Sequence, residues 1–252
     1  MTGARGVLGT ALMTRLDARD RVPIDRHDGA EIADRVAMRE LLSGCEVLVH
    51  LAAIHPLVAA ADTDYVAANV TPFAALLDVA RAVGVERIVF ASSTSVWSDA
   101  AEGMPCRFID ESTRPDGIGE YARSKLVCEA LLGASGFHSV VFRLARFAQE
   151  SDPADTVRLL YRAVRPAAAA DAIVRAIDDA RAEGLFALSA PTPFRPEDAD
   201  RLARDPRSVI RERTGSEPAW VPDRIGSVIL SGRAQRELGW GSESRSASRR
   251  DE

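Results

Sequence analysis

Short apolar runs alternate with helix-like segments over the first 150 residues, and this alternation restricts the fold more than any other feature of the chain. The strand-like runs cover residues 21–25, 46–50, 87–91 and 138–143, and the helix-like segments cover residues 10–16, 35–43, 64–83 and 120–132. Residues 46–50 are apolar almost throughout, as in a parallel strand covered on both faces. Because parallel strands need right-handed helical crossovers, the sequence predicts an α/β fold with a doubly wound parallel sheet.

The pattern loosens after residue 150. An alanine-rich helix is predicted over residues 166–182 and a strand over residues 185–189, followed by three prolines within residues 191–196. We therefore expect a main dinucleotide-binding domain over residues 1–150, a smaller substrate-side cap over residues 151–241, and a polar tail over residues 242–252.

The first turn of the chain has almost nothing ahead of it. Met1 stands one residue before Thr2-Gly3, where a doubly wound sheet has a central strand of about six residues. Three buried branched side chains there would contribute roughly 4–9 kcal/mol. We therefore expect that the fold lacks most of its first strand and that further chain precedes Met1.

Three glycines with the spacing GxxGxxG, Gly3, Gly6 and Gly9, precede the first helix-like segment. Glycines let the backbone turn tightly and approach a pyrophosphate, and the N-terminus of the next helix supplies free N–H groups and a positive dipole. The turn therefore predicts a dinucleotide site and makes the expected sheet Rossmann-like.

Asp25 ends the next strand, about 20 residues beyond the glycine turn, where a carboxylate can accept hydrogen bonds from both hydroxyls of an adenosine ribose. This favours NAD as the cofactor, because the carboxylate would repel the 2′-phosphate of NADP. Arg5 and Arg26 keep NADP open as the alternative, since either guanidinium can pair with that phosphate.

Lys125 is the only lysine among the 32 lysines and arginines of the chain, and it follows Tyr121 by four residues. In a sequence that otherwise uses arginine, this exception marks a place where a compact ammonium is required. The two side chains share one helix face. An ammonium that lowers the phenol pKa by roughly 3 units, helped by the positive nicotinamide of the cofactor, would make Tyr121 a base near neutral pH. The same ammonium can bind the nicotinamide ribose.

Four hydroxyl residues, 92–95, follow the strand over residues 87–91 at the edge where a parallel sheet exposes its ligands. A hydroxyl there can donate a hydrogen bond to a substrate oxygen that gains or loses a proton.

The chain resembles the extended short-chain dehydrogenases/reductases, the NAD-dependent epimerase/dehydratase group, over about residues 1–150. The resemblance rests on the glycine turn, Ser92-Ser93, the Tyr121/Lys125 pair, the run His50-Leu-Ala-Ala53, and Asn69. It implies that Ser93 is the catalytic hydroxyl, with Tyr121 as the base and Lys125 as its partner.

The resemblance also implies further cofactor contacts. Glu31 stands where the family places an acid against the adenine, and Leu51, Ala52 and Ala53 would line the cofactor. Asn69 would lie on the helix beneath the site. A homodimer through the helices over residues 64–83 and 120–132 is implied as well.

The departures from the family pattern concern the substrate. Nucleotide-sugar 4,6-dehydratases follow the catalytic threonine with Asp-Glu, and this chain has Thr94-Ser95, so we do not expect dehydration. Arg146 replaces the asparagine that commonly holds a nucleotide sugar. We therefore assign Thr94 and Arg146 to the substrate. The arginines 143, 146, 158 and 162 are expected to suit a carboxylate or phosphate, or else to lie on solvated faces.

The composition excludes several other function classes. The net charge of −5 argues against a nucleic-acid partner. No uninterrupted apolar run reaches the roughly 18 residues of a membrane span, and no secretory signal opens the chain. The three cysteines, Cys45, Cys106 and Cys128, form no CxxC pair, which favours reduced thiols in a cytoplasm and no metal site.

We therefore predict a cytoplasmic NAD(P)-dependent dehydrogenase, reductase or epimerase. It would move hydride to or from a secondary alcohol or ketone of a sugar-like small molecule. The arginines of the chain favour an anionic one. The alternative is a dinucleotide-binding sensor without turnover, which the short first strand and the altered substrate residues favour.

Overall fold

A parallel sheet forms the centre of the computed structural model, which describes residues 1–149 and 151–241. The sheet has the strand order β1 (Val47–His50), β2 (Arg87–Ser93), β4 (His138–Leu144) and β7 (Gly184–Leu188), all parallel. The predicted α/β fold with a doubly wound sheet is confirmed. The predicted tail over residues 242–252 lies outside the described residues.

The first residues of the chain lie in the sheet where the first strand is expected. Thr2 forms isolated parallel bridges with Ile24 on one side and His50 on the other. The predicted strand over residues 21–25 is therefore wrong as a regular strand and is reduced to the bridge at Ile24. The physical reason is that a strand needs a neighbour of matching length, and here the neighbour is two residues long.

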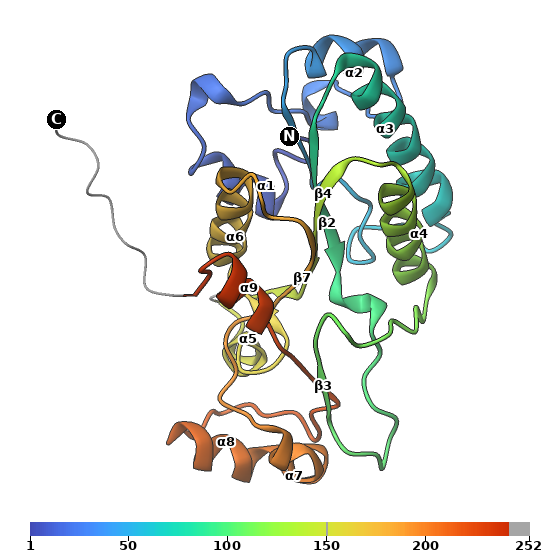
Figure 1. Cartoon of the computed structure of the whole chain (residues 1–252). Helices are drawn as coiled ribbons and strands as arrows, with labels where there is room; N and C mark the ends of the chain where they lie inside the picture. Colours follow the sequence, from blue (N-terminus) through green and yellow to red (C-terminus); the bar gives the residue numbers. More distant parts are fainter. Residues whose placement is uncertain (150, 242–252) are drawn as a thin grey trace, which may run out of the picture.

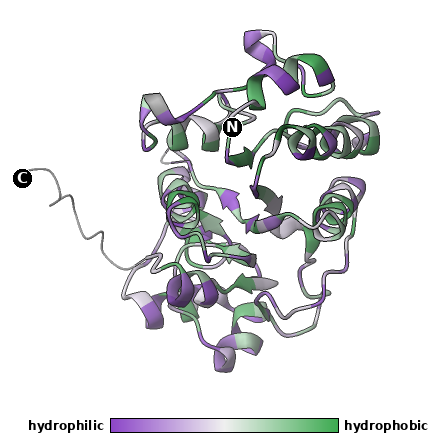
Figure 2. Cartoon of the chain, turned by 45° about the horizontal axis from the view of Figure 1, so that its top comes forward, coloured by the Kyte–Doolittle hydropathy of each residue, from purple (hydrophilic) through white to green (hydrophobic). Residues whose placement is uncertain are grey.

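Helices cover both faces of the sheet (Figure 1). One face carries α1 (Val7–Met13), α6 (Pro166–Asp178) and α9 (Gly232–Glu237), and the other carries α2 (Arg35–Leu42), η3 (Val66–Val70), α3 (Thr71–Val83) and α4 (Glu120–Ala134). Each face has its own apolar core: α1 and α6 pack in the first cluster, and α2, α3 and α4 pack in the second. Hydrophobic residues run through the strands and their flanking helices (Figure 2).

The remaining elements lie mostly at one end of the sheet (Figure 1). They are the strands β3 (Arg107–Ile109), β5 (Arg146–Phe147), β6 (Ala163–Val164) and β8 (Ser227–Ile229), the helices α5 (Pro153–Arg158), α7 (Ala199–Arg204) and α8 (Pro206–Thr214), and short helical turns at η1 (Ala18–Asp20), η2 (Arg26–Asp28), η4 (Thr94–Val96) and η5 (Pro196–Asp198). The pairs β3–β8 and β5–β6 form two small parallel sheets. The cap over residues 151–241 stays a prediction, and β7 and α6 from that range belong to the central sheet and its covering layer.

One helix of the described residues bears on the prediction about membrane spans. Residues 66–83, which form η3 and α3, are long and apolar enough to cross a membrane by length and composition alone, although no uninterrupted apolar run suggested it. Phe73, Leu76 and Leu77 of this helix are buried in the second apolar cluster. A core helix of a globular protein meets the same criterion, so this finding is weak evidence for a membrane.

Candidate active site

The glycine turn is packed so closely that its glycines cannot be replaced without moving backbone. Gly3 has φ +71°, and a Cβ atom there would lie 2.8 Å from the Ala52 nitrogen. A Cβ atom on Gly9 would lie 2.1 Å from the Gly3 carbonyl oxygen, and one on Gly6 would lie 3.3 Å from the same oxygen. The turn therefore forms the tight cradle that a pyrophosphate requires.

Asp25 ties the glycine turn to the next segment. Its carboxylate accepts hydrogen bonds from the backbone N–H of Arg5 at 2.9 Å and from that of His27 at 3.1 Å. Burial acts to raise the pKa of Asp25, but these two hydrogen bonds outweigh it and hold the pKa below its ordinary value. The carboxylate thus stays ionised and keeps lone pairs for ribose hydroxyls.

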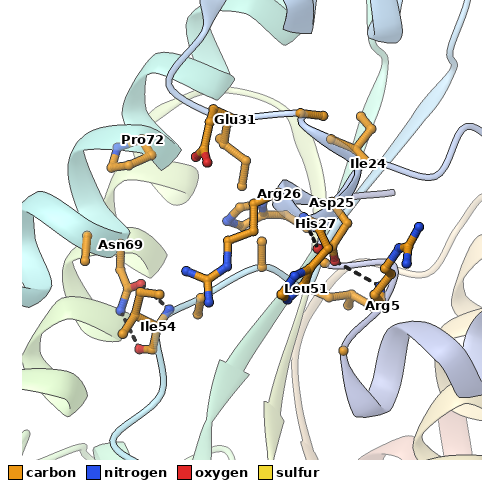
Figure 3. Close-up of a pocket in the computed structure, with 18 of the residues that line it drawn as sticks. Arg5, Ile24, Asp25, Arg26, His27, Glu31, Leu51, Ile54, Asn69 and Pro72 are labelled. Carbon is orange, nitrogen blue, oxygen red and sulfur yellow. Dashed lines mark hydrogen bonds between the residues drawn. The ribbon is translucent and has the colours of Figure 1, made fainter. Parts of the chain in front are cut away.

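The two arginines near this carboxylate differ in their partners. The Arg5 guanidinium pairs with Asp28 through both Nη2 and Nε, the latter at 2.9 Å. The Arg26 side chain instead extends into the pocket toward Asn69 and Ile54 (Figure 3). Of the two predicted candidates for a 2′-phosphate, Arg5 is therefore already neutralised by an acid.

A pocket of about 310 Å³ lies between the glycine turn and the helix that carries Asn69 (Figure 3). Ten of the predicted cofactor residues line it: Gly3, Arg5, Gly6, Asp25, Arg26, Glu31, Leu51, Ala52, Ala53 and Asn69. Gly9, Tyr121 and Lys125 are not among its lining residues. Sequence reasoning missed His27, Ile32, Val58 and Pro72, which also line the pocket but belong to no motif that would single them out.

Asn69 holds the wall of the pocket in place. Its Oδ1 accepts the Ile54 backbone N–H at 2.7 Å, and its Nδ2 donates to the Ile54 carbonyl oxygen at 3.1 Å. The amide therefore fixes the segment over residues 51–54 from both sides, and its predicted place beside the site is where it lies.

We expect Asn69→Asp to destabilise this wall, because a carboxylate oxygen would face the Ile54 carbonyl oxygen in place of a donor. The free energy of unfolding should fall by about 2 kcal/mol and dinucleotide affinity by about tenfold. Chemical denaturation and titration calorimetry measure both quantities at pH 8, where the new carboxyl is ionised. Unchanged affinity would show that the hydrogen bonds between Asn69 and Ile54 do not shape the pocket.

The predicted catalytic residues come together beside this pocket. Ser93 ends β2 and Tyr121 lies in the first turn of α4, and the Ser93 hydroxyl lies near enough to the phenol to lower its pKa. Ser93 Oγ also accepts the Ser95 backbone N–H at 3.1 Å, which fixes its orientation. Thr94 begins η4 and is buried, and its assignment to the substrate stays a prediction.

Lys125 is 4% exposed and projects from α4 toward the end of β2. Its Nζ donates to the Ala91 carbonyl oxygen at 2.8 Å and lies 5.9 Å from the centre of the Tyr121 ring. Burial lowers the pKa of Lys125 to about 8, and the nearby Cys128 and Glu129 act in the opposite direction. The ammonium therefore remains the main form at neutral pH.

The predicted lowering of the Tyr121 pKa, which relies in part on the positive charge of a bound nicotinamide, is not found in the protein alone. Burial raises the pKa of Tyr121 to about 12, while the nearby Ser93 hydroxyl lowers it only in part. Lys125 does not offset the burial, since its charge lies 5.9 Å from the ring centre. At neutral pH the phenol therefore carries its proton and can donate it.

Two observations on the residues of the site indicate that it fits a dinucleotide. The glycine turn leaves no room for a side chain where a pyrophosphate would approach. The buried ammonium of Lys125 donates to Ala91 and has two further hydrogens, which suit ribose hydroxyls. Lys125, Asp25 and the glycine turn are the residues that would hold NAD.

The four arginines predicted to suit an anionic substrate all have acidic partners. Arg143 pairs with Glu129 at 2.7 Å, and Arg162 pairs with Asp99 at 2.7 Å. Arg146 and Arg158 both pair with Asp155, at 3.1 and 2.8 Å. Carboxylates elsewhere in the sequence thus neutralise these charges in the protein alone, and the arginine-rich anion pocket stays a prediction. Arg146 keeps a side chain that is 41% exposed.

His50 makes the stability of the folded protein sensitive to acid. Its ring stacks with those of Phe73 and Phe90, which also stack with each other, and its Nδ1 lies 2.7 Å from Thr2 Oγ1. Burial, followed by the positive charge of Lys125, lowers the pKa of His50 to about 3. The folded protein therefore binds no proton at His50 in the range where the unfolded chain does.

We expect stability to fall as the pH decreases below about 6.5, because only the unfolded state gains the proton. This single residue should cost about 2 kcal/mol by pH 5. Denaturation curves at several pH values should show a shallower pH dependence for His50→Phe, which keeps the stacking and removes the titrating group. Parallel curves for the two proteins would contradict the assignment.

Comparison with known proteins identifies the family. Residues 1–179 match the profile of the NAD dependent epimerase/dehydratase family. The chain belongs to this family. All of the predicted cofactor residues and the Ser93, Tyr121 and Lys125 set fall within the matched range, as the sequence resemblance implied.

A curated relative and two solved structures show how far the family likeness extends. A 4-hydroxy-2-methyl-3-oxo-4-farnesyl-3,4-dihydroquinoline-1-oxide ketoreductase of Stigmatella aurantiaca is 29% identical over 188 residues, 66% of this chain and 54% of that protein. The chain thus spans about half the length of this relative. MoeE5 in complex with UDP-glucose and NAD is 22% identical, with a TM-score of 0.66 over 95% of this chain and 91% of that one.

The second structure is a DesIV double mutant (dTDP-glucose 4,6-dehydratase) from Streptomyces venezuelae with NAD and DAU bound. It is 18% identical, with a TM-score of 0.68 over 95% of this chain and 90% of that one. At these identities the likeness to the epimerase/dehydratase structures shows the fold, and the reaction has to be argued from the site.

Proposed function

We propose that this protein is an NAD-dependent oxidoreductase or epimerase that moves hydride to or from a secondary alcohol or ketone of a sugar-like small molecule. The observation that carries the proposal is the meeting of Ser93, Tyr121 and Lys125 at the end of β2, beside a pocket lined by the predicted cofactor residues. This set supplies an oriented hydroxyl, a proton donor and a fixed positive charge.

Each residue has a distinct part in this function. NAD, when bound, supplies the hydride acceptor, and its reduced form the donor. Ser93 holds the reacting oxygen, since its hydroxyl is oriented by the Ser95 backbone N–H. Tyr121 gives the proton to that oxygen or takes it away, and Lys125 holds the ribose and stabilises the phenolate.

The protonation state of Tyr121 favours ketone reduction near neutral pH. A phenol with a pKa of about 12 carries its proton at neutral pH, so the proton donor is present and almost no phenolate is available as a base. The ketoreductase named among the relatives supports this direction, and the neighbours that hold UDP-sugars support a sugar-like substrate. We propose no dehydration, because Thr94-Ser95 stands where 4,6-dehydratases have Asp-Glu.

We propose NAD over NADP, because Asp25 is ionised and Asp28 occupies the Arg5 guanidinium. Asp28→Asn should release Arg5 and raise the affinity for NADP relative to NAD by about three- to tenfold. Fluorescence titrations with both reduced cofactors measure the ratio. The gain should be absent when Arg5→Ala is added, and a gain that survives in the double variant would exclude Arg5 as its source.

A cofactor-oxidation and cofactor-reduction screen tests the proposed function. NADH is offered with ketones and keto-sugars, NAD with sugars, uronates, UDP-sugars and secondary alcohols, and interconversion of epimers is followed by NMR. We expect turnover by the native protein and turnover lowered by about 1,000-fold in Tyr121→Phe. Dinucleotide binding with no turnover on any substrate would instead indicate a sensor.

We further propose a cytoplasmic homodimer. The three free cysteines of the described residues, one half-buried and two buried, suit a reducing compartment. Val66 on η3 and Val127 on α4 are exposed apolar side chains on the helices expected to meet a second copy. Sedimentation measurements test the oligomeric state.

A further inference from the structure

His55 lies beside the catalytic phenol, although the sequence analysis assigned it no role. The centre of its ring is 5.1 Å from that of Tyr121, and the two rings meet at 72°. Ile54 and Val58, close to it on either side in the chain, line the dinucleotide pocket. His55 therefore stands where that pocket meets Tyr121.

The hydrogen bonding of His55 fixes which ring nitrogen carries the proton. The Leu57 backbone N–H donates to His55 Nδ1 at 3.2 Å. A ring nitrogen that accepts a hydrogen bond has no hydrogen of its own, so the neutral ring carries its hydrogen on Nε2. Burial, followed by the charges of Lys125 and Arg146, lowers the pKa of His55 and keeps the ring neutral at physiological pH.

The surroundings of this Nε2–H point to a substrate oxygen. Of the groups near the ring, the Lys125 ammonium and the Arg146 guanidinium have no acceptor atom, and the described residues show no hydrogen bond from the ring to the Tyr121 phenol. Across residues 1–149 and 151–241 no hydrogen bond from His55 Nε2 is found, while Nδ1 is paired. His55 is exposed and lies beside the catalytic acid, so its donor can meet an incoming hydroxyl or carbonyl.

We propose that His55 is a substrate-binding residue that donates its Nε2–H to a second oxygen of the substrate, on the carbon next to the one whose oxygen meets Tyr121 and Ser93. The proposal rests on the proposed function and narrows its substrate to vicinal diols and α-hydroxy ketones, the pattern of a sugar ring. A site that donates to a substrate hydroxyl rejects the analogue that lacks it.

Two substitutions separate this role from a structural one. In His55→Gln the side-chain amide places an N–H donor near the position of Nε2 but gives up the Nδ1 acceptor. In His55→Asn the amide oxygen can still accept the Leu57 N–H, but the distant donor is lost. If His55 binds the substrate, its function should survive in His55→Gln. If His55 only supports the loop, its function should survive in His55→Asn.

The probes are trans-1,2-cyclohexanediol and cyclohexanol, each oxidised with NAD. We expect the native protein to prefer the diol in kcat/KM by at least about tenfold, because one hydrogen bond contributes a free energy that corresponds to about this ratio. His55→Gln should keep most of this preference, and His55→Asn should lose it. NAD affinity and Tm, measured for all three proteins, should change little.

Other outcomes overturn the proposal in distinguishable ways. A preference that survives in His55→Asn, or one lost only in His55→Gln, would assign His55 to the loop and leave the proposed function intact. No oxidation of either alcohol by the native protein, with a negative substrate screen, would overturn the proposed function and this proposal with it. An NMR titration that shows an Nδ1–H tautomer, or protonation near pH 6.5, would overturn the proposal alone.

Discussion

Tyr121→Phe is expected to lower kcat by about 1,000-fold while NAD affinity stays within about threefold. The substitution removes only the hydroxyl that exchanges the proton with the substrate, and positioned acid–base groups contribute about 10²- to 10⁴-fold. Lys125 Nζ keeps its hydrogen bond to the Ala91 carbonyl oxygen, so the group that would hold the ribose is unaffected. Steady-state rates and NAD titrations measure the two effects.

The pH dependence distinguishes the proton donor from a merely structural ring. Since burial raises the pKa of Tyr121 to about 12, ketone reduction should be nearly independent of this group up to pH 9, and alcohol oxidation should rise with pH over the same range. Tyr161→Phe is the matched control, because Tyr161 is buried in the separate apolar cluster beneath α7 and α8. Equal losses in both variants would exclude a special role for residue 121.

Gly9→Ala is expected to destabilise the fold by at least about 3 kcal/mol and to weaken NAD binding by at least about 100-fold. The added methyl group would lie 2.1 Å from the Gly3 carbonyl oxygen and 2.7 Å from the Ala4 carbonyl oxygen. Both obstacles are backbone atoms, so relief requires the glycine turn itself to move, and overpacking of this kind usually costs about 1–3 kcal/mol or more. Chemical denaturation and calorimetry measure both quantities.

Gly133→Ala provides the matched control for that substitution. Gly133 also lies in a helix, α4, but a Cβ atom there would meet nothing within 4 Å. Alanine should therefore stabilise this helix by up to about 1 kcal/mol and leave NAD affinity unchanged. If Gly9→Ala behaved like Gly133→Ala, the close contact at the turn would have no energetic consequence.

The parts of the site that depend on local spacing were predictable from the sequence. The glycine turn, the i and i+4 relation of Tyr121 and Lys125, and the hydroxyl cluster after β2 need only one turn or one helix face to be understood. Lys125 was marked further by being the single lysine of the chain. Such features survive any moderate error in the predicted ends of helices and strands.

Contacts between distant residues could not be predicted. The charge of Arg143 is neutralised by Glu129, 14 positions away, and that of Arg162 by Asp99, 63 positions away. No pattern in the sequence states these pairings. The raised Tyr121 pKa was not predictable for a related reason, because spacing shows that a cation is near but not how strongly the phenol is buried.

The two apolar cores described above give the pocket a mechanical consequence. The glycine turn belongs to the core built on α1 and α6, whereas Ile24 and the helix carrying Asn69 belong to the core built on α2, α3 and α4. A dinucleotide held by both walls would fasten the two halves of the molecule together across the sheet. Its binding should therefore synchronise their unfolding, so that amides in both halves exchange their hydrogens in a single shared opening.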